Sequence, residues 1–180
     1  MAVFLALADY DHFRKAKTEE IGDASRWQVY QYDNYHFSFE SPFPLLKNKK
    51  MFVDVLKLNK KLFLYADAPD QSFHLVVESQ EYRGSVPSDH LDQFQKKVVG
   101  LFQSNPGIQN FRSEARPVTF SDQPGLEVAG SYTLHGDFYQ FDGIEVAKGN
   151  WSWNLETVFQ DQSRLADQAQ QIFQSLKIQD

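Results

Sequence analysis

Histidine and serine are the residue types in this sequence that could carry catalysis or hold a metal. The five histidines form no close ligand pair such as HxH or HExxH. His36 and His74 fall in segments that alternate like β-strands, so they could meet carboxylates in space and bind a metal. Solvent-facing or hydrogen-bonded strand histidines are the simpler interpretation, and no metal site is predicted.

Motifs for nucleophilic or nucleotide chemistry are absent from the sequence. The segment Gly84-Ser85-Val86-Pro87-Ser88 lacks the GxSxG elbow, and Ser88 is explained as a helix N-cap. There are no cysteines and no glycine-rich phosphate loop. The carboxylates are dispersed, so no acid–base pair stands out, although a pair assembled in space stays open. The sequence predicts no catalytic residue, cofactor or enzyme activity; three or more polar side chains converging in a cleft would contradict this.

Aromatic residues are dense in two neighbouring segments near the C-terminus. Phe138–Phe141 and Trp151–Gln160 both read as strands, and together they offer a candidate ligand groove or partner surface. The candidate residues are Tyr139, Phe141, Trp151 and Trp153. The alternative interpretation is core packing against a helix that follows.

Six lysines gather in a short stretch of this otherwise acidic chain, at Lys47, Lys49, Lys50, Lys57, Lys60 and Lys61. Lys47, Lys49, Lys50, Lys60 and Lys61 are candidates for a patch that meets anionic lipid head groups or an acidic partner. The alternative is that these lysines flank a hairpin turn and protect edge strands from pairing.

Composition and charge narrow the class of protein. The chain has 180 residues, a length that suits one domain with its own core. Its net charge of -6 argues against nucleic acid, which needs a broad basic face. Aromatic residues make up 15% of the chain, which favours strands.

The hydrophobic spacing predicts an α+β domain with an antiparallel sheet and two helices. Helical spacing of apolar residues places the helices at about 88–103 and 162–177. Asp33-Asn34, Asn59-Lys60 and Asp142-Gly143 are predicted turns between strands. We expect residues 27–180 to form the domain, and residues 1–26 to hold an apolar run and a polar linker or peripheral helix.

The apolar run Ala2–Ala8 has two interpretations. Ala6-Leu7-Ala8 has the small-x-small form of a signal-peptidase site, although the run is too short to span a bilayer and lacks a basic start. In the first interpretation a longer apolar segment lies upstream, so that the domain is exported or tethered to a membrane. In the second, residues 2–8 open a native helix on a cytosolic assembly factor.

The order of elements resembles a known superfamily. Tyr35-His36-Phe37-Ser38-Phe39 leads into Ser41-Pro42-Phe43-Pro44, a capped helix Ser88–Phe102 follows, Gln123-Pro124-Gly125 opens a strand, and Phe173-Gln174-Ser175-Leu176-Lys177 closes the chain. This pattern, over about residues 27–178, resembles the PsbP-like α/β/α sandwich superfamily of PsbP, a Ran-binding nuclear import factor and bacterial DcrB-type lipoproteins.

That resemblance implies an antiparallel sheet flanked by helices and a non-enzymatic binding or assembly role. The expected function is therefore an accessory domain with a protein partner, exported or close to a membrane, and without nucleic acid. The alternative is a small-molecule-binding protein or enzyme with a pocket beside strands 138–141 and 151–159. No family motif transfers a functional residue to this chain.

Overall fold

A computed structural model describes residues 18–21, 27–120 without 49–57, and 122–179. Its main feature is an antiparallel sheet of eight strands in the order β1-β4-β5-β6-β10-β9-β8-β7. The strands are β1 (Thr18–Ile21), β4 (Leu45–Asn48), β5 (Leu58–Asp67), β6 (Phe73–Tyr82), β7 (Ile108–Phe120), β8 (Gln123–Leu134), β9 (Asp137–Lys148) and β10 (Trp151–Gln160). The central strands β6, β9 and β10 carry apolar residues on both faces, which indicates that both faces are covered.

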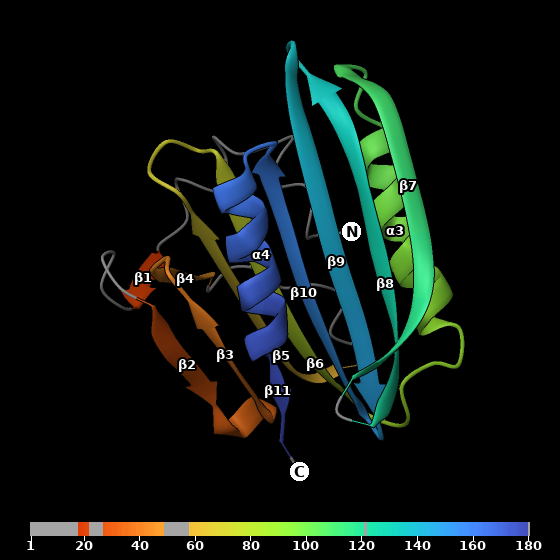
Figure 1. The fold of residues 1–180 in the computed structure, drawn as a ribbon. Helices are drawn as coiled ribbons and strands as arrows, with labels where there is room; N and C mark the ends of the chain where they lie inside the picture. The colour runs from red at the N-terminus through yellow and green to blue at the C-terminus, as the bar shows by residue number, and fades with distance from the viewer. Residues whose placement is uncertain (1–17, 22–26, 49–57, 121, 180) are drawn as a thin grey trace.

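A smaller sheet lies beside α4 on one face of the main sheet. It has three strands in the order β11-β3-β2, with β2 at Gln28–Tyr32, β3 at Phe37–Ser41 and β11 at Lys177–Ile178. A short 3-10 turn, η1 (Asp33–Tyr35), joins β2 to β3. The small sheet thereby places the C-terminal strand β11 beside β3, a strand from the N-terminal part of the chain (Figure 1).

The two α-helices cover opposite faces of the main sheet (Figure 1). Helix α4 (Ser163–Ser175) presents Leu165, Ala169 and Ile172 to a core shared with the small sheet and β10. Helix α3 (His90–Gln103) presents Phe94, Val98 and Phe102 to a second core, on the other face. Both stripes recur at three- or four-residue spacing, as an amphipathic helix requires.

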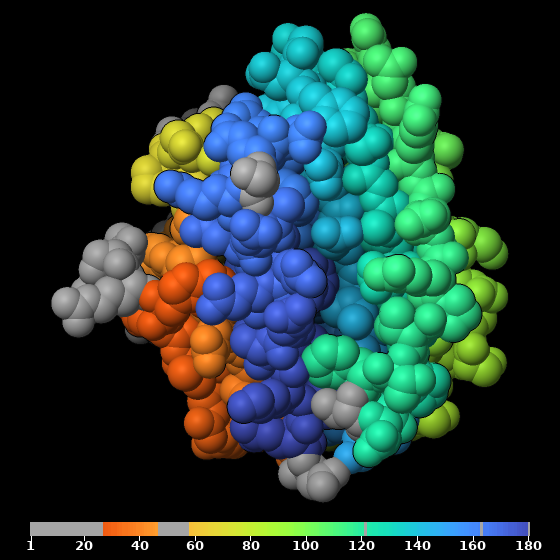
Figure 2. Space-filling view, viewed as in Figure 1, coloured from red at the N-terminus to blue at the C-terminus, as the bar shows by residue number. Residues whose placement is uncertain are grey.

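The space-filling view of the α4 face shows that α4 and the small sheet cover this side of the main sheet (Figure 2). The α4 side chains form one continuous surface with the small sheet on one side and strands β8 and β9 on the other. The layers are therefore helix and small sheet, main sheet, and helix. This confirms the predicted α+β class and the antiparallel sheet flanked by helices.

The helices lie close to their predicted positions, whereas two predicted turns and part of the predicted linker form strands instead. Asp142-Gly143 lies inside β9, because both residues pair with β8 on one side and β10 on the other. Asn59-Lys60 lies inside β5, where the register shifts against β6. Residues Thr18–Ile21, predicted as linker or helix, form the edge strand β1. Cross-strand pairing overrides turn propensity in β5 and β9, and it overrides the expected linker or helix in β1.

Residues 2–8 and most of the predicted linker lie outside the described residues. Among the helices that the structure describes, none has the length and apolar character needed to cross a bilayer.

Candidate functional site

Four polar residues share the face of the sheet that lies under α3. Glu78 of β6, Asn154 of β10 and Glu145 of β9 form one rung of directly opposed residues. Glu156 lies two residues along β10 from Asn154, so it points to the same face. All four are less than a tenth exposed, which is unusual for carboxylates in a strand.

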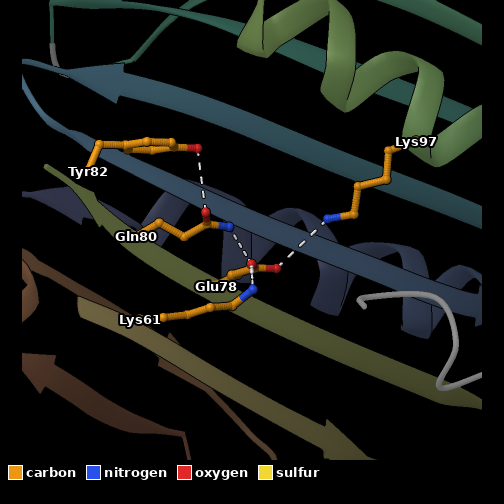
Figure 3. A network of polar contacts seen from close by, with 5 residues as sticks. All are labelled: Lys61, Glu78, Gln80, Tyr82 and Lys97. Carbon is orange, nitrogen blue, oxygen red and sulfur yellow. Dashed lines mark hydrogen bonds and ion pairs between the residues drawn. The ribbon is translucent and has the colours of Figure 1, made fainter. Parts of the chain in front are cut away.

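Two lysines reach this rung from different elements (Figure 3). Lys61 of β5 forms an ion pair with Glu78, and Lys97 of α3 places its Nζ 3.8 Å from Glu78 Oε2. Gln80 donates a hydrogen bond to Glu78 Oε1, and Tyr82 donates one to Gln80 at 3.4 Å. We call Lys61, Glu78, Lys97, Glu145, Asn154 and Glu156 the acid–lysine cluster.

Glu78 is the carboxylate that both lysines neutralise. Burial alone would raise the pKa of Glu78, but Lys97 and Lys61 outweigh burial and hold it below its ordinary value. Burial would likewise lower the pKa of Lys97, but Glu78, Glu156 and Glu145 together raise it. Glu78 and Lys97 are therefore both charged at neutral pH.

Glu145 and Glu156 lack such neutralisation. Burial raises the pKa of Glu145 to about 8 and that of Glu156 to about 7, with Lys97 offsetting part of each shift. Asn154 lies close enough to lower both values, yet neither its side-chain atoms nor the oxygens of Glu156 have a partner at hydrogen-bond geometry. Glu156 is thus a buried acid that is half protonated near neutral pH.

The cluster is better suited to bind and release a proton than to hold a metal ion. Within the described part of the chain, no three His, Asp or Glu side chains have the geometry to hold a metal ion. Carboxyls with a raised pKa and an adjacent lysine are typical of acid–base sites. These polar side chains converge in the buried interior between α3 and the sheet. Convergence in a cleft is the observation that would contradict the predicted absence of enzyme activity, so that absence stays a prediction.

Sequence reasoning missed this cluster because its members come from five elements. Each glutamate follows an apolar residue of its strand, as in Val76-Val77-Glu78 and Ile144-Glu145-Val146. An acidic residue in a strand that is apolar on both sides indicates burial. That signal marks each residue singly, but only the strand order shows that they meet.

The predicted aromatic residues do not form one surface. Phe141 is buried in the α3 core, where its ring lies 4.3 Å from that of Phe102. Tyr139 stacks on Tyr132 at that same core. Trp153 is buried in the α4 core on the other face, and Trp151 packs against that core. The alternation of β9 and β10 thus divides the four residues between two sides of the sheet.

Trp151 is the half-buried centre of a smaller aromatic group. Its ring lies 5.2 Å from that of His36 and 6.1 Å from that of Tyr35, both edge-on. Lys60 Nζ lies 5.8 Å from the Trp151 ring centroid, within cation–π range. We call Tyr35, His36, Lys60 and Trp151 the Trp151 surface.

Buried contacts hold the Trp151 surface in place. Trp153 Nε1 donates a 2.7 Å hydrogen bond to the carbonyl oxygen of Tyr35. His36 has a positive φ of 58°, which turns the chain from η1 into β3. The surface is therefore built on the sheet instead of on a free loop.

The predicted lysine patch is divided as well. Lys61 points under α3 and pairs with Glu78, so it does not belong to a surface patch. Its neighbour Lys60 points to the opposite face and is 53% exposed. Lys60 Nζ lies 3.9 Å from Glu81 Oε2. Lys47 lies in β4, and Lys49, Lys50 and Lys57 lie outside the described residues.

The remaining candidates have structural partners. His74 Nδ1 lies 2.7 Å from Asp67 Oδ1, in a pair between adjacent strands. Helix α3 begins at His90 with Asp89 as its N-cap. Ser88 lies in the turn just before, so its prediction as the cap is wrong by one residue.

The curled antiparallel sheet between two helices defines the class of protein: this chain has the PsbP-like fold. It is similar to cyanobacterial PsbP (CyanoP) from Synechocystis sp. PCC 6803, with a TM-score of 0.59 and 11% identity over 92% of this chain and 99% of that one.

Two other solved structures are similar at lower scores. LpqN of Mycobacterium tuberculosis, described as involved in cell envelope biogenesis, has a TM-score of 0.44 and 13% identity over 95% of this chain and 96% of that one. A protein of Bacteroides thetaiotaomicron VPI-5482 has a TM-score of 0.48 and 12% identity over 88% of this chain and 50% of that one. No protein-family model and no curated protein matches this sequence.

Proposed function

We propose that this chain is a non-enzymatic accessory domain that binds a protein partner through the Trp151 surface. The observation that carries the proposal is the half-buried Trp151, framed by Tyr35, His36 and Lys60. Tryptophan in a fixed setting beside a polar rim is typical of the residues that dominate protein interfaces.

The chemistry of the rim narrows the kind of partner. Lys60 is exposed, and its partner Glu81 also accepts a hydrogen bond from Asn150 at 3.3 Å. Lys60 can therefore turn toward a carboxylate of the partner at little cost, since an exposed ion pair is weak. We expect a protein segment that offers an apolar side chain for Trp151 and an acidic one for Lys60.

Photo-crosslinking in the native host tests this proposal. A crosslinker at position 60 should capture a defined protein, whereas one at Arg112, on the edge strand β7, should not. The purified partner should then lose at least about tenfold in affinity with Trp151→Ala, because truncating an interface tryptophan often costs about 2 kcal/mol or more.

A matched control separates this loss from a general effect of removing surface rings. Phe138 is the exposed aromatic of β9, at 44%, and Phe138→Ala should bind as the wild type does. Equal crosslinking at positions 60 and 112, or unchanged affinity of Trp151→Ala, would contradict the proposal.

The proposal includes a location outside the cytoplasm or tethered to a membrane. Its support is the small-x-small pattern Ala6-Leu7-Ala8 behind an apolar run. The genomic reading frame should then extend upstream of Met1 with enough apolar residues for a signal or anchor. An in-frame stop codon just before Met1 would remove this part of the proposal and leave the partner surface untouched.

A second candidate function is an acid–base enzyme that uses Glu145 and Glu156, and the convergence of the acid–lysine cluster favours it. A substrate must reach those carboxyls, however, and Glu145 is 8% exposed and Glu156 3%. An activity that is lost in Glu156→Gln and kept in Glu114→Gln, whose glutamate lies on the exposed edge strand β7, would establish the enzyme.

A further inference from the structure

The charges of the acid–lysine cluster do not balance when all its members ionise. Three carboxylates, Glu78, Glu145 and Glu156, face two ammonium groups, Lys61 and Lys97. Both lysines lie within ion-pair range of Glu78. One buried negative charge is therefore left without a neutralising cation. We assign it to Glu156, because this side chain is 97% buried and its two oxygens have no hydrogen-bond partner.

We propose that the acid–lysine cluster is a site for an exchangeable proton shared by Glu145 and Glu156, and that losing this proton loosens α3 from the sheet. The site is distinct from the Trp151 surface and does not depend on the proposed partner. The ligand of this site is a proton, and its binding strengthens the packing of α3 against the sheet.

The packing around Glu156 favours a proton over a metal ion. A side chain at Gly143, directly opposite Glu156 in the sheet, would come within 3.1 Å of the Phe94 ring and 3.3 Å of Glu156 Cγ. Phe94 and Glu156 thus fill the space beside Gly143. The described residues also provide no three-ligand group for a metal. A proton needs no cavity.

The elements packed against the pair differ in the groups that they contribute. Tyr82 of β6 is a titratable group that interacts with Glu145. Strand β6 contributes Glu78 and α3 contributes Lys97, and both act on Glu145 and Glu156. Strand β8 places the apolar Leu126 opposite Glu145. Lys61 of β5 is engaged by Glu78. Lys97 is thus the cation that lowers the pKa of both acids, and it comes from the helix.

Helix α3 is the element that closes over the cluster. Its Phe94 is 3% exposed and packs beside Glu156, and Lys97 lies one turn further along. When this part of α3 separates from the sheet, water reaches both carboxyls and their pKa values return toward the ordinary value. Deprotonation is therefore easier in the open state, and rising pH shifts the equilibrium toward it.

With pKa values raised from 4.5 to about 8 and about 7, the packing of α3 weakens as pH rises from about 4.5 to 8, and measurements between pH 6 and 9 cover the upper part of this loss. The charge of Glu156 raises the pKa of Glu145, so the two acids titrate as a coupled pair. Helix α4 lies on the opposite face, away from the cluster. The protection of α4 amides therefore serves as an internal reference for that of α3 amides.

Hydrogen exchange of the full chain, corrected for the intrinsic pH dependence of exchange, tests the proposal. Between pH 6 and 9 we expect protection of α3 amides 94–103 to fall at least about tenfold, since one pKa unit is a factor of ten. Protection of α4 amides should change far less. In the double variant Glu145→Gln/Glu156→Gln the α3 protection should stay constant, while Glu114→Gln should behave as wild type.

Three results would overturn the proposal. The first is equal loss of protection in α3 and α4, which would indicate global unfolding. The second is an undiminished pH effect in the double variant. The third is full recovery of α3 protection at pH 9 on adding Na⁺, K⁺, Mg²⁺ or Ca²⁺ at millimolar concentration, which would identify a metal ion as the ligand. If the double variant does not fold, Glu156→Gln alone should reduce the pH effect, and an unchanged effect would contradict the proposal.

Discussion

Lys60 and Lys61 are consecutive residues of β5 that point to opposite faces of the main sheet. Lys61 is 14% exposed and pairs with the buried Glu78, whereas Lys60 is 53% exposed and lies over Trp151. The sequence places both lysines in one basic group, because sequence proximity does not show which face a side chain takes. The pairing of β5 with β6 determines which side chains of β5 face α3 and which face the other side, and therefore what each lysine contacts.

The two lysines should differ sharply in their effect on stability. Lys61→Ala leaves Glu78 with Lys97 alone, and breaking a buried ion pair is expected to lower the free energy of unfolding by about 3 kcal/mol. Lys60→Ala removes an exposed contact and should cost no more than about 1 kcal/mol. Urea unfolding of both variants at pH 7 measures the difference, and similar losses would show that Lys61 is not the buried partner.

Helices and strands of this fold differ in how well the sequence predicts them. The apolar stripes of α3 and α4 are local signals, and the predicted ends lie within a few residues of the observed ones. The long strands β5 and β9 were expected as broken pieces, because Asn59-Lys60 and Asp142-Gly143 carry strong turn propensity. Pairing with neighbouring strands decides these segments, and it depends on residues that are distant in the sequence.

Two glycines in different elements should respond oppositely to alanine. At Gly130 of β8 a Cβ atom would lie 2.1 Å from the Arg112 carbonyl oxygen and 2.6 Å from the Phe141 ring. Gly130→Ala should therefore destabilise the protein by about 1–3 kcal/mol, as overpacking does. Gly100→Ala, at a position on α3 with open space around it, should stabilise it by about 0.5–1 kcal/mol. Thermal unfolding measures both, and the same sign for both would contradict the packing.

At the scale of the whole molecule, the sequence could predict the class of fold, but it could not predict which polar side chains meet in the interior. The order of helices and aromatic strands indicated an α/β/α sandwich, and the similarity to CyanoP confirms the fold. The acid–lysine cluster needs β5, β6, β9 and β10 in their observed order before its side chains meet. No spacing along the chain encodes that order.

The same interior predicts how stability depends on pH. A carboxyl whose pKa is raised in the folded state stabilises the fold fully below its unfolded value and loses that contribution as pH rises through the folded value. For Glu145 and Glu156 this window runs from about pH 4.5 to 8. Glu78, whose pKa is lowered, acts in the opposite direction and loses its contribution as pH falls.

The free energy of unfolding should therefore fall between pH 5 and 8.5, by an amount on the order of 6 kcal/mol. Urea titrations across this range measure it. The variant Glu145→Gln/Glu156→Gln should show a flat profile there and be at least as stable as wild type at pH 8. A wild-type profile that rises with pH would mean that the two carboxyls are ionised in the fold.

The central claim is that the interior holds protonated carboxyls at neutral pH, and carbon-13 NMR of the glutamate side chains tests it most directly. In the folded chain, labelled at glutamate Cδ and assigned by Glu→Gln variants, the Glu145 and Glu156 pair should titrate with apparent pKa values of about 8 and about 7. The Glu78 carboxyl should titrate below its ordinary value. Titration of all three near the ordinary glutamate value would contradict the account.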